Sequence, residues 1–206
     1  MVGIASIYLA SRSPRRRELL NQIGIAHEVL TTRITVDRIP DVNEDPLPGE
    51  APRDYVRRVC RAKVESGWLR VIQRKLVMRG VLAADTTVCI GDEILGTPTN
   101  AAQAAEFLAR LSGREHEVLT AIAFKLGERM EAELSVTTVR FRELSQGEIS
   151  RYVASGEPSD KAGAYAIQGR AGAFITEIRG SYSGVMGLPL YETAMLLRRF
   201  DIGPPA

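Results

Sequence analysis

A run of arginines lies where a predicted strand turns into a predicted helix, close to the N-terminus. Ser13 is a preferred N-cap, Pro14 is a preferred first helical residue, and residues 15–17 are all arginine. Each cation at the positive end of a helix dipole costs ~0.3–1 kcal/mol. A bound anion would reverse that cost, because free backbone N–H groups and guanidinium groups would converge on it. The pattern predicts a phosphate-binding site; the alternative is an arginine-rich helix start exposed to solvent.

Asp85 is the leading candidate for catalysis. It directly follows residues 81–84, a short and wholly apolar segment typical of a strand buried in a mixed sheet. Strand ends in α/β sheets are where ligands bind and reactive groups gather. A partly desolvated carboxylate there could hold a divalent metal or take a proton from water. The alternative is an aspartate that caps a turn by accepting the Thr87 N–H.

Three further polar residues could bind or recognise a nucleotide. Glu44, in an acidic loop, offers a second oxygen ligand to a hard cation such as Mg²⁺ or Mn²⁺. Lys161 stands among small residues that would let it approach a triphosphate as a point charge. Gln168 has one donor and one acceptor group, which could pair with the imide edge of uracil or thymine. Lys161 and Gln168 could equally be exposed loop residues, and His27 and His116 are expected to be structural.

Helices and strands alternate along the chain with a hairpin in the middle, which predicts a mixed α/β or α+β fold. Ser145 and Glu148 form a capping box at one helix start, and Thr99 is the expected N-cap of another. The predicted strands are residues 4–10, 26–32, 81–84 and 173–178, with a hairpin of 117–126 and 132–142 joined at 127–128. The short strand 81–84 runs into residues 85–90, ahead of a turn at 91–92. The predicted helices are residues 14–23, 52–73, 100–111, 145–155 and 189–200, and residues 37–52 form a surface loop.

The composition is that of an ordinary globular protein. Of 206 residues, 45% are hydrophobic and 25% are charged, and a net charge of +2 is too small to imply a nucleic-acid or membrane partner. Basic residues crowd residues 53–79, most simply as the outer face of an amphipathic helix, with nucleic-acid binding as the alternative. Cys60 and Cys89 lack metal-ligand spacing, and no apolar run has the form of a signal peptide or a membrane span. We therefore expect a cytoplasmic protein with reduced thiols.

Six short motifs, in order along the chain, give it a resemblance to the Maf-type nucleotide pyrophosphatases, also called septum formation inhibitor proteins. They are ASRSPRR at 10–16, ADTTV at 84–88, LSG at 111–113, DKAGAY at 160–165, IQG at 167–169 and GLPL at 187–190. The resemblance implies one domain over residues 1–206, with two lobes around an active-site cleft. It also implies a Maf/inosine-triphosphatase-like α/β fold, with a long, mixed, highly twisted central sheet flanked by helices.

The activity implied by this resemblance is hydrolysis of nucleoside triphosphates to the monophosphate and pyrophosphate with a divalent metal, Mg²⁺ or Mn²⁺. Asp85 matches the family's proton acceptor, and we expect it to hold the metal together with Glu44. The residues expected to bind the phosphates are Ser11, Arg15, Arg16 and Lys161.

Three positions distinguish branches of the family. Arg15, Thr86 and Gln168 look like the branch that acts on dTTP and UTP, whereas the branch acting on 7-methyl-GTP carries Trp, Gln and Glu there. Two departures stand out, because Thr97 replaces the family's usual lysine before a proline and Asn43 replaces the aspartate of an Asp-Glu pair. Loss of that lysine should weaken electrostatic stabilisation of the developing phosphate charge.

Two other functions stay open on the sequence. A catalytically weak or inactive nucleotide-binding regulator would keep the pocket without the chemistry, as Thr97 allows. A nucleic-acid-binding protein would use the basic residues 53–79. We favour the enzyme, with a nucleoside triphosphate substrate, no stable nucleic-acid partner and no membrane association. The resemblance further implies a homodimer and a role in house-cleaning of nucleotide pools or in cell-division arrest.

Overall fold

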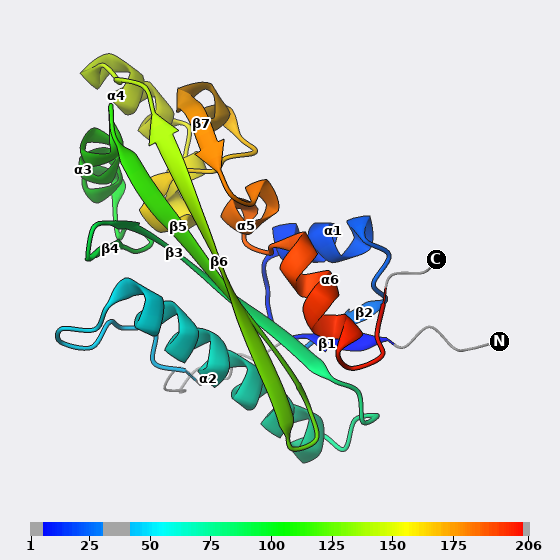
Figure 1. Cartoon of the computed structure of the whole chain (residues 1–206). Helices are drawn as coiled ribbons and strands as arrows, with labels where there is room; N and C mark the ends of the chain where they lie inside the picture. The colour runs from blue at the N-terminus through cyan, green and yellow to red at the C-terminus, as the bar shows by residue number, and fades with distance from the viewer. Residues whose placement is uncertain (1–5, 31–41, 204–206) are drawn as a thin grey trace.

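A long twisted sheet runs through the part of the chain that the computed structural model describes, residues 6–30 and 42–203 (Figure 1). Its seven strands are ordered β2-β1-β3-β5-β6-β7, with β4 paired to β3. β1 lies parallel to β2 and β3, and the other pairs are antiparallel. The strands are β1 (Ile7–Leu9), β2 (His27–Val29), β3 (Val81–Ile90), β4 (Glu93–Leu95), β5 (Glu115–Leu126), β6 (Arg129–Phe141) and β7 (Ile175–Arg179).

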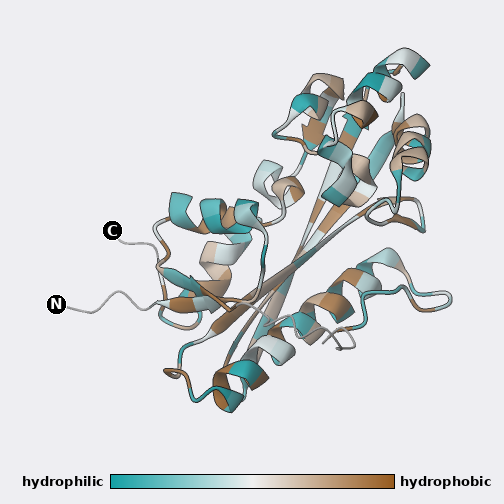
Figure 2. Cartoon of the chain, turned by 180° about the vertical axis from the view of Figure 1, so that it is seen from behind, coloured by the Kyte–Doolittle hydropathy of each residue, from teal (hydrophilic) through white to brown (hydrophobic). Residues whose placement is uncertain are grey.

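Helices cover both faces of the long central strands, and the alternation of side chains along each strand decides which core a residue joins. In β3, Val81 and Ala83 are buried against α2 (Pro52–Gln73). Leu82 and Ala84 face the other way, into a core shared with α1 (Pro14–Gln22) and α6 (Leu190–Arg198). Figure 2 shows the hydrophobic residues concentrated along these crossing strands, while α1 is hydrophilic over much of its surface.

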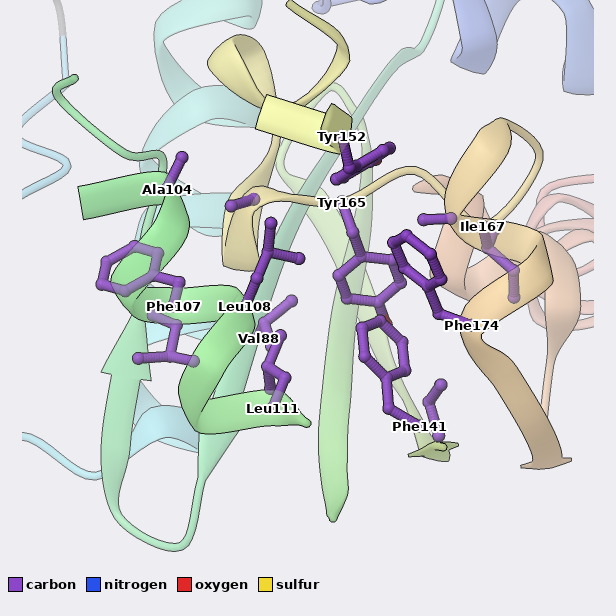
Figure 3. Close-up of a cluster of buried hydrophobic side chains, with 14 of the residues drawn as sticks. Val88, Ala104, Phe107, Leu108, Leu111, Phe141, Tyr152, Tyr165, Ile167 and Phe174 are labelled. Carbon is purple, nitrogen blue, oxygen red and sulfur yellow. The ribbon is translucent and has the colours of Figure 1, made fainter. Parts of the chain in front are cut away.

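A third core, rich in aromatic residues, fills the far end of the sheet (Figure 3). Tyr165 and Phe174 both pack edge-to-face on Phe141, with ring centroids 4.9 and 6.1 Å apart respectively. These rings fix the irregular segment that follows α4. The elements here are α3 (Ala101–Leu111), α4 (Gln146–Ala154), three 3-10 turns at Glu157–Asp160, Ala162–Ala164 and Arg170–Phe174, and the short helix α5 (Tyr182–Met186).

The predicted fold class is confirmed: the protein is a mixed α/β structure with a long mixed sheet flanked by helices. The helix expected at residues 52–73 has those bounds, with a proline in its first turn. The hairpin turns at residues 127–128 as predicted, and the capping box of Ser145 and Glu148 is present. Both cysteines are free and buried, and no helix in the described residues is long and apolar enough to cross a membrane.

Several local predictions were wrong. The strand that was expected to lead up to Asp85 continues to Ile90, so Asp85 lies in the middle of β3 and not at its end. Thr99 is not the N-cap of α3, because the Asn100 side chain accepts the Gln103 N–H. Ser13 is the N-cap residue of α1 as predicted, but its side chain makes no cap bond. The sequence interpretation also missed β4, α5 and the 3-10 turns.

Parts of three predicted segments lie outside the described residues. These are residues 4–5 of the first predicted strand, 31–32 of the second and 37–41 of the acidic loop.

Gly163 links the aromatic end of the molecule to β3 and offers a test of this packing. Its φ of +66° is in the left-handed region, and a Cβ there would lie 2.8 Å from the Val88 Cγ2 atom. Gly91 has a similar φ of +58° but open space around it. Gly91→Ala should therefore cost only the backbone strain, ~1–2 kcal/mol. Gly163→Ala should lose about 1–3 kcal/mol more of unfolding free energy through overpacking, as measured by urea denaturation. Equal losses would contradict this packing.

Candidate active site

A cavity of about 300 Å³ opens between the β1–α1 junction, the middle of β3, α2 and residues 160–168. Its wall brings together cationic and acidic side chains from segments far apart in sequence. Arg15 and Arg16 share this cavity with Asp85, as the phosphate-site hypothesis requires. The charged residues that line it are Arg15, Arg16, Lys63 and Lys161 on the basic side, and Glu44, Asp85 and Asp160 on the acidic side.

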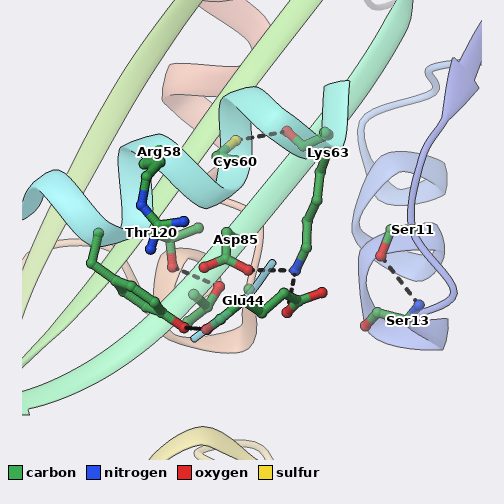
Figure 4. A network of polar contacts seen from close by, with 12 residues as sticks. Ser11, Ser13, Glu44, Arg58, Cys60, Lys63, Asp85 and Thr120 are labelled. Atoms are coloured by element: carbon green, nitrogen blue, oxygen red, sulfur yellow. Dashed lines mark hydrogen bonds and ion pairs between the residues drawn. The ribbon is translucent and has the colours of Figure 1, made fainter. Parts of the chain in front are cut away.

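Lys63 joins the two carboxylates that were predicted to bind metal (Figure 4). Its Nζ atom lies 2.7 Å from the Asp85 Oδ1 atom and 2.8 Å from the Glu44 Oε2 atom. Asp85 is only 6% exposed, so the ammonium group offsets the cost of burying its charge. Sequence reasoning missed Lys63 as a site residue and placed it among the cations of an outer helix face. The position of Lys63 in the sequence could have identified it. It stands next to Val64 and one turn after Cys60, both buried, and therefore lies at the edge of the apolar face of α2.

The loop that carries Glu44 is tied to α2 by two side chains. The Tyr55 hydroxyl donates to the Glu44 carbonyl at 2.9 Å. Arg58 donates to the carbonyls of Asn43 and Asp45, at 3.1 and 3.0 Å. It also makes two bonds to the Glu50 carboxylate, which lower the pKa of that group to about 2. The main chain on both sides of Glu44 is thus fixed relative to Lys63.

Arg16 is a partly buried cross-link and not a free side chain. Its Nε atom donates to the Gly187 carbonyl at 2.8 Å, and its Nη1 and Nη2 atoms donate to the hydroxyls of Ser11 and Thr86 at 3.2 and 3.3 Å. Burial lowers the pKa of Arg16, and the nearby Asp85 charge opposes that shift. The residue therefore joins the β1–α1 junction to β3 and to the turn after α5.

Ser11 and Arg15 differ in their access to the cavity. The Ser11 hydroxyl accepts the Ser13 N–H at 3.2 Å as well as the Arg16 bond, and Ser11 is not among the lining residues. Arg15 lines the cavity, and no described residue forms a hydrogen bond or ion pair with it. Its guanidinium group is thus available to an anion.

Three hydrogen bonds hold the segment that carries Gln168. The Tyr152 hydroxyl accepts the Ala166 N–H at 3.3 Å and donates to the Glu157 carboxylate at 2.8 Å. Glu157 in turn accepts the Arg170 N–H at 3.2 Å. The backbone is therefore held two residues before and two residues after Gln168, which is itself exposed and lines the cavity.

The remaining predicted residues also line the cavity. Lys161 pairs with Asp160, and Thr86 lies on the opposite face of β3 from Asp85. Thr97, which stands where the resemblance predicts a lysine, is part of the wall as well.

The two cysteines are not candidates for a nucleophile. Burial, with the Asp85 charge as a second cause, raises the pKa of the Cys60 thiol to about 12. Burial likewise raises the pKa of Cys89 to about 11. Both thiols therefore stay protonated near neutral pH.

The donor set fits a hard divalent cation. Asp85 and Glu44 contact one and the same ammonium nitrogen, so a single positive charge placed between them can meet both carboxylates. The described residues contain no group of three His, Cys, Asp or Glu that could hold a metal. Oxygen atoms from the substrate or water would have to complete the coordination, as is usual for Mg²⁺ bound with phosphates.

Comparison with known proteins gives one family and many close relatives. The profile of the family described as Maf-like protein matches residues 6–200. A dTTP/UTP pyrophosphatase of Nitrosomonas europaea is 57% identical over 196 residues, which cover 95% of each chain. A dTTP/UTP pyrophosphatase of Dechloromonas aromatica is 53% identical over 198 residues, which cover 96% of this chain and 98% of its own. The solved structure of the Ham1 protein of Staphylococcus aureus covers 82% of this chain and 90% of its own, with a TM-score of 0.44 and 14% identity.

His116 lies behind the cavity wall and makes stability depend on pH. Its Nε2 atom is 2.8 Å from the hydroxyl of Tyr165, a lining residue, and its buried Nδ1 atom has no hydrogen-bond partner among residues 6–30 and 42–203. Burial lowers the pKa of His116 from 6.5 to about 4. Between these values the unfolded chain binds a proton that the folded chain does not, so stability falls as the pH falls.

We expect wild-type protein to lose about 2 kcal/mol more unfolding free energy than His116→Gln between pH 7.5 and pH 5. Glutamine can still form a hydrogen bond with Tyr165 but does not titrate. Urea denaturation of both proteins at the two pH values measures the difference. Parallel losses in the two proteins would show that His116 is not the titrating group.

Proposed function

The chain belongs to the Maf family, and we propose that it hydrolyses dTTP and UTP to the nucleoside monophosphate and pyrophosphate. One observation carries this proposal: the guanidinium groups of Arg15 and Arg16 share a cavity with the buried carboxylate of Asp85. Guanidinium groups can bind a triphosphate, and a carboxylate can take the proton from the water that hydrolyses it. The names of the relatives support the choice of dTTP and UTP.

In this mechanism Asp85 acts as the general base. Lys63 holds its Oδ1 atom, and the Oδ2 atom has no hydrogen-bond partner in the described part of the chain. Asp85 takes a proton from water, and the water oxygen bonds to the α-phosphorus as the bond from that phosphorus to the bridging oxygen breaks. The electron pair leaves with pyrophosphate. Fixing water and phosphorus in line supplies much of the acceleration that such reactions need.

Cationic side chains compensate the charge on the phosphate oxygens. Arg15 is the side chain with free donors, and Lys161, which is paired with Asp160, also lines the cavity. Arg16 contributes its charge from behind, and Ser11 positions it. A divalent cation would be held by Asp85 and Glu44 and would neutralise further phosphate charge.

Base selection is assigned to Thr86 and Gln168, which would pair with the imide edge of a pyrimidine. By the same family resemblance we extend the proposal to a homodimer, to a metal-dependent reaction, and to the removal of unwanted pyrimidine triphosphates from the nucleotide pool. Thr97 favours a second candidate function, which is nucleotide binding without turnover, because the cavity wall carries no charge at that residue.

Asp85→Asn tests the catalytic assignment. We expect kcat for pyrophosphate release from dTTP and UTP to fall by about 10²–10⁴-fold, because amide nitrogen and oxygen cannot accept the proton. Glu93→Gln, which removes a carboxylate paired with Arg110 outside the cavity, should leave kcat unchanged. Thermal stabilisation of wild-type protein by dTTP without any released pyrophosphate would instead favour the binding protein. Full activity in Asp85→Asn would remove Asp85 from this role.

Chelation and the Glu44 side chain test the cation. EDTA should abolish pyrophosphate release, and added Mg²⁺ or Mn²⁺ should restore it. Glu44→Gln should raise the metal concentration for half-maximal activity at least about tenfold, because one charged ligand is lost. Asp45→Asn is the matched control, since it removes a neighbouring carboxylate of the same loop, and it should behave as wild type. Activity that survives EDTA would refute the metal requirement.

A further inference from the structure

A line of hydrogen bonds leads from Arg16 through two hydroxyls into the core. The Arg16 Nη2 atom is 3.3 Å from the Thr86 Oγ1 atom, which is 3.0 Å from the Thr120 Oγ1 atom. Thr120 then donates to the Gly184 carbonyl at 2.8 Å. Thr86 and Thr120 are directly opposite in the β3–β5 register.

The chemistry of the two ends fixes the direction of every proton in this line. A guanidinium group only donates and a carbonyl only accepts, whereas a hydroxyl has one proton and two lone pairs. Because the Thr120 proton goes to the Gly184 carbonyl, Thr120 must accept from Thr86. Thr86 accepts from Arg16 with one lone pair. Thr86 can therefore offer the cavity only its second lone pair, and no proton.

A hydroxyl that can only accept distinguishes uracil and thymine from cytosine. Uracil and thymine carry an N–H donor at N3, whereas cytosine carries a lone pair there. Gln168 alone cannot separate them, because its amide can turn to present either group, and no described residue forms a hydrogen bond that fixes it. An oxygen atom that only accepts would bind the imide N–H and repel the cytosine nitrogen.

We propose that Thr120 is a positioning residue for base selectivity, which it exerts by taking the Thr86 proton and leaving Thr86 as a pure acceptor toward the substrate. Thr120 is 1% exposed and does not line the cavity, so it acts through Thr86 and not by touching the nucleotide. The inference rests on the proposed function, because it takes Thr86 to face the base.

Thr120→Val is the decisive substitution. It removes the acceptor at nearly constant shape, so the Thr86 hydroxyl becomes free to turn and donate to cytosine. The ratio of kcat/KM for UTP to that for CTP should fall at least about tenfold, since one hydrogen bond to a buried polar group accounts for a change of that order. Thr120→Ser keeps the hydroxyl and should keep the wild-type ratio.

Other results would overturn the inference. They are an equal loss for UTP and CTP in Thr120→Val, an equal relaxation in Thr120→Ser, or a wild-type protein that treats UTP and CTP alike. The last measurement needs no variant and applies even if Thr120→Val fails to fold. If wild-type protein releases no pyrophosphate from UTP or dTTP, the proposed function fails. The inference is then judged separately, from the ratio of the Kd values for UTP and CTP measured by calorimetry on the same proteins.

Discussion

The constraint on which this structure depends is a carboxylate in the middle of a buried strand. Asp85 lies inside β3 and is 6% exposed, where an unpaired charge would cost several kcal/mol. Lys63 supplies the counter-charge from α2, which already packs on that face of β3. The same ammonium group also binds Glu44, so the neutralisation of one buried charge brings an acidic loop to the mouth of the cavity.

The alternation of side chains along β3 then divides the site into two. Asp85 lies on the face of β3 toward α2, where Lys63 joins it to Glu44. Thr86 lies on the face toward α1 and the turn after α5, where its hydroxyl bonds Arg16 and Thr120. Because successive residues of a strand lie on opposite faces, neighbouring residues can serve separate tasks without competing for the same partners. In our proposal one face carries the chemistry and the other reads the base, and the strand fixes the distance between them.

Local signals predicted much of this fold, and long-range contacts account for what was missed. The bounds of α2 follow from a proline in its first turn and from its apolar stripe, both of which are visible in the sequence. The end of β3 was misplaced because the polar residue Asp85 was taken to end the strand, although the two threonines after it favour strands. Lys63 was missed because its partners lie 19 and 22 residues away, and no local pattern encodes such contacts.

The charges of the cavity wall explain how the site can bind a triphosphate with Thr97 where the family usually has a lysine. Lys63 is shared between two carboxylates and Lys161 is paired with Asp160, so both are largely neutralised before any ligand arrives. Arg16 bonds only neutral oxygens, and Arg15 forms no hydrogen bond or ion pair with the described residues. The positive charge that an incoming phosphate meets is therefore that of the two arginines. In the proposed reaction, with a neutral threonine in the wall, the share of transition-state charge that Arg15 must stabilise is larger than it would be beside a lysine.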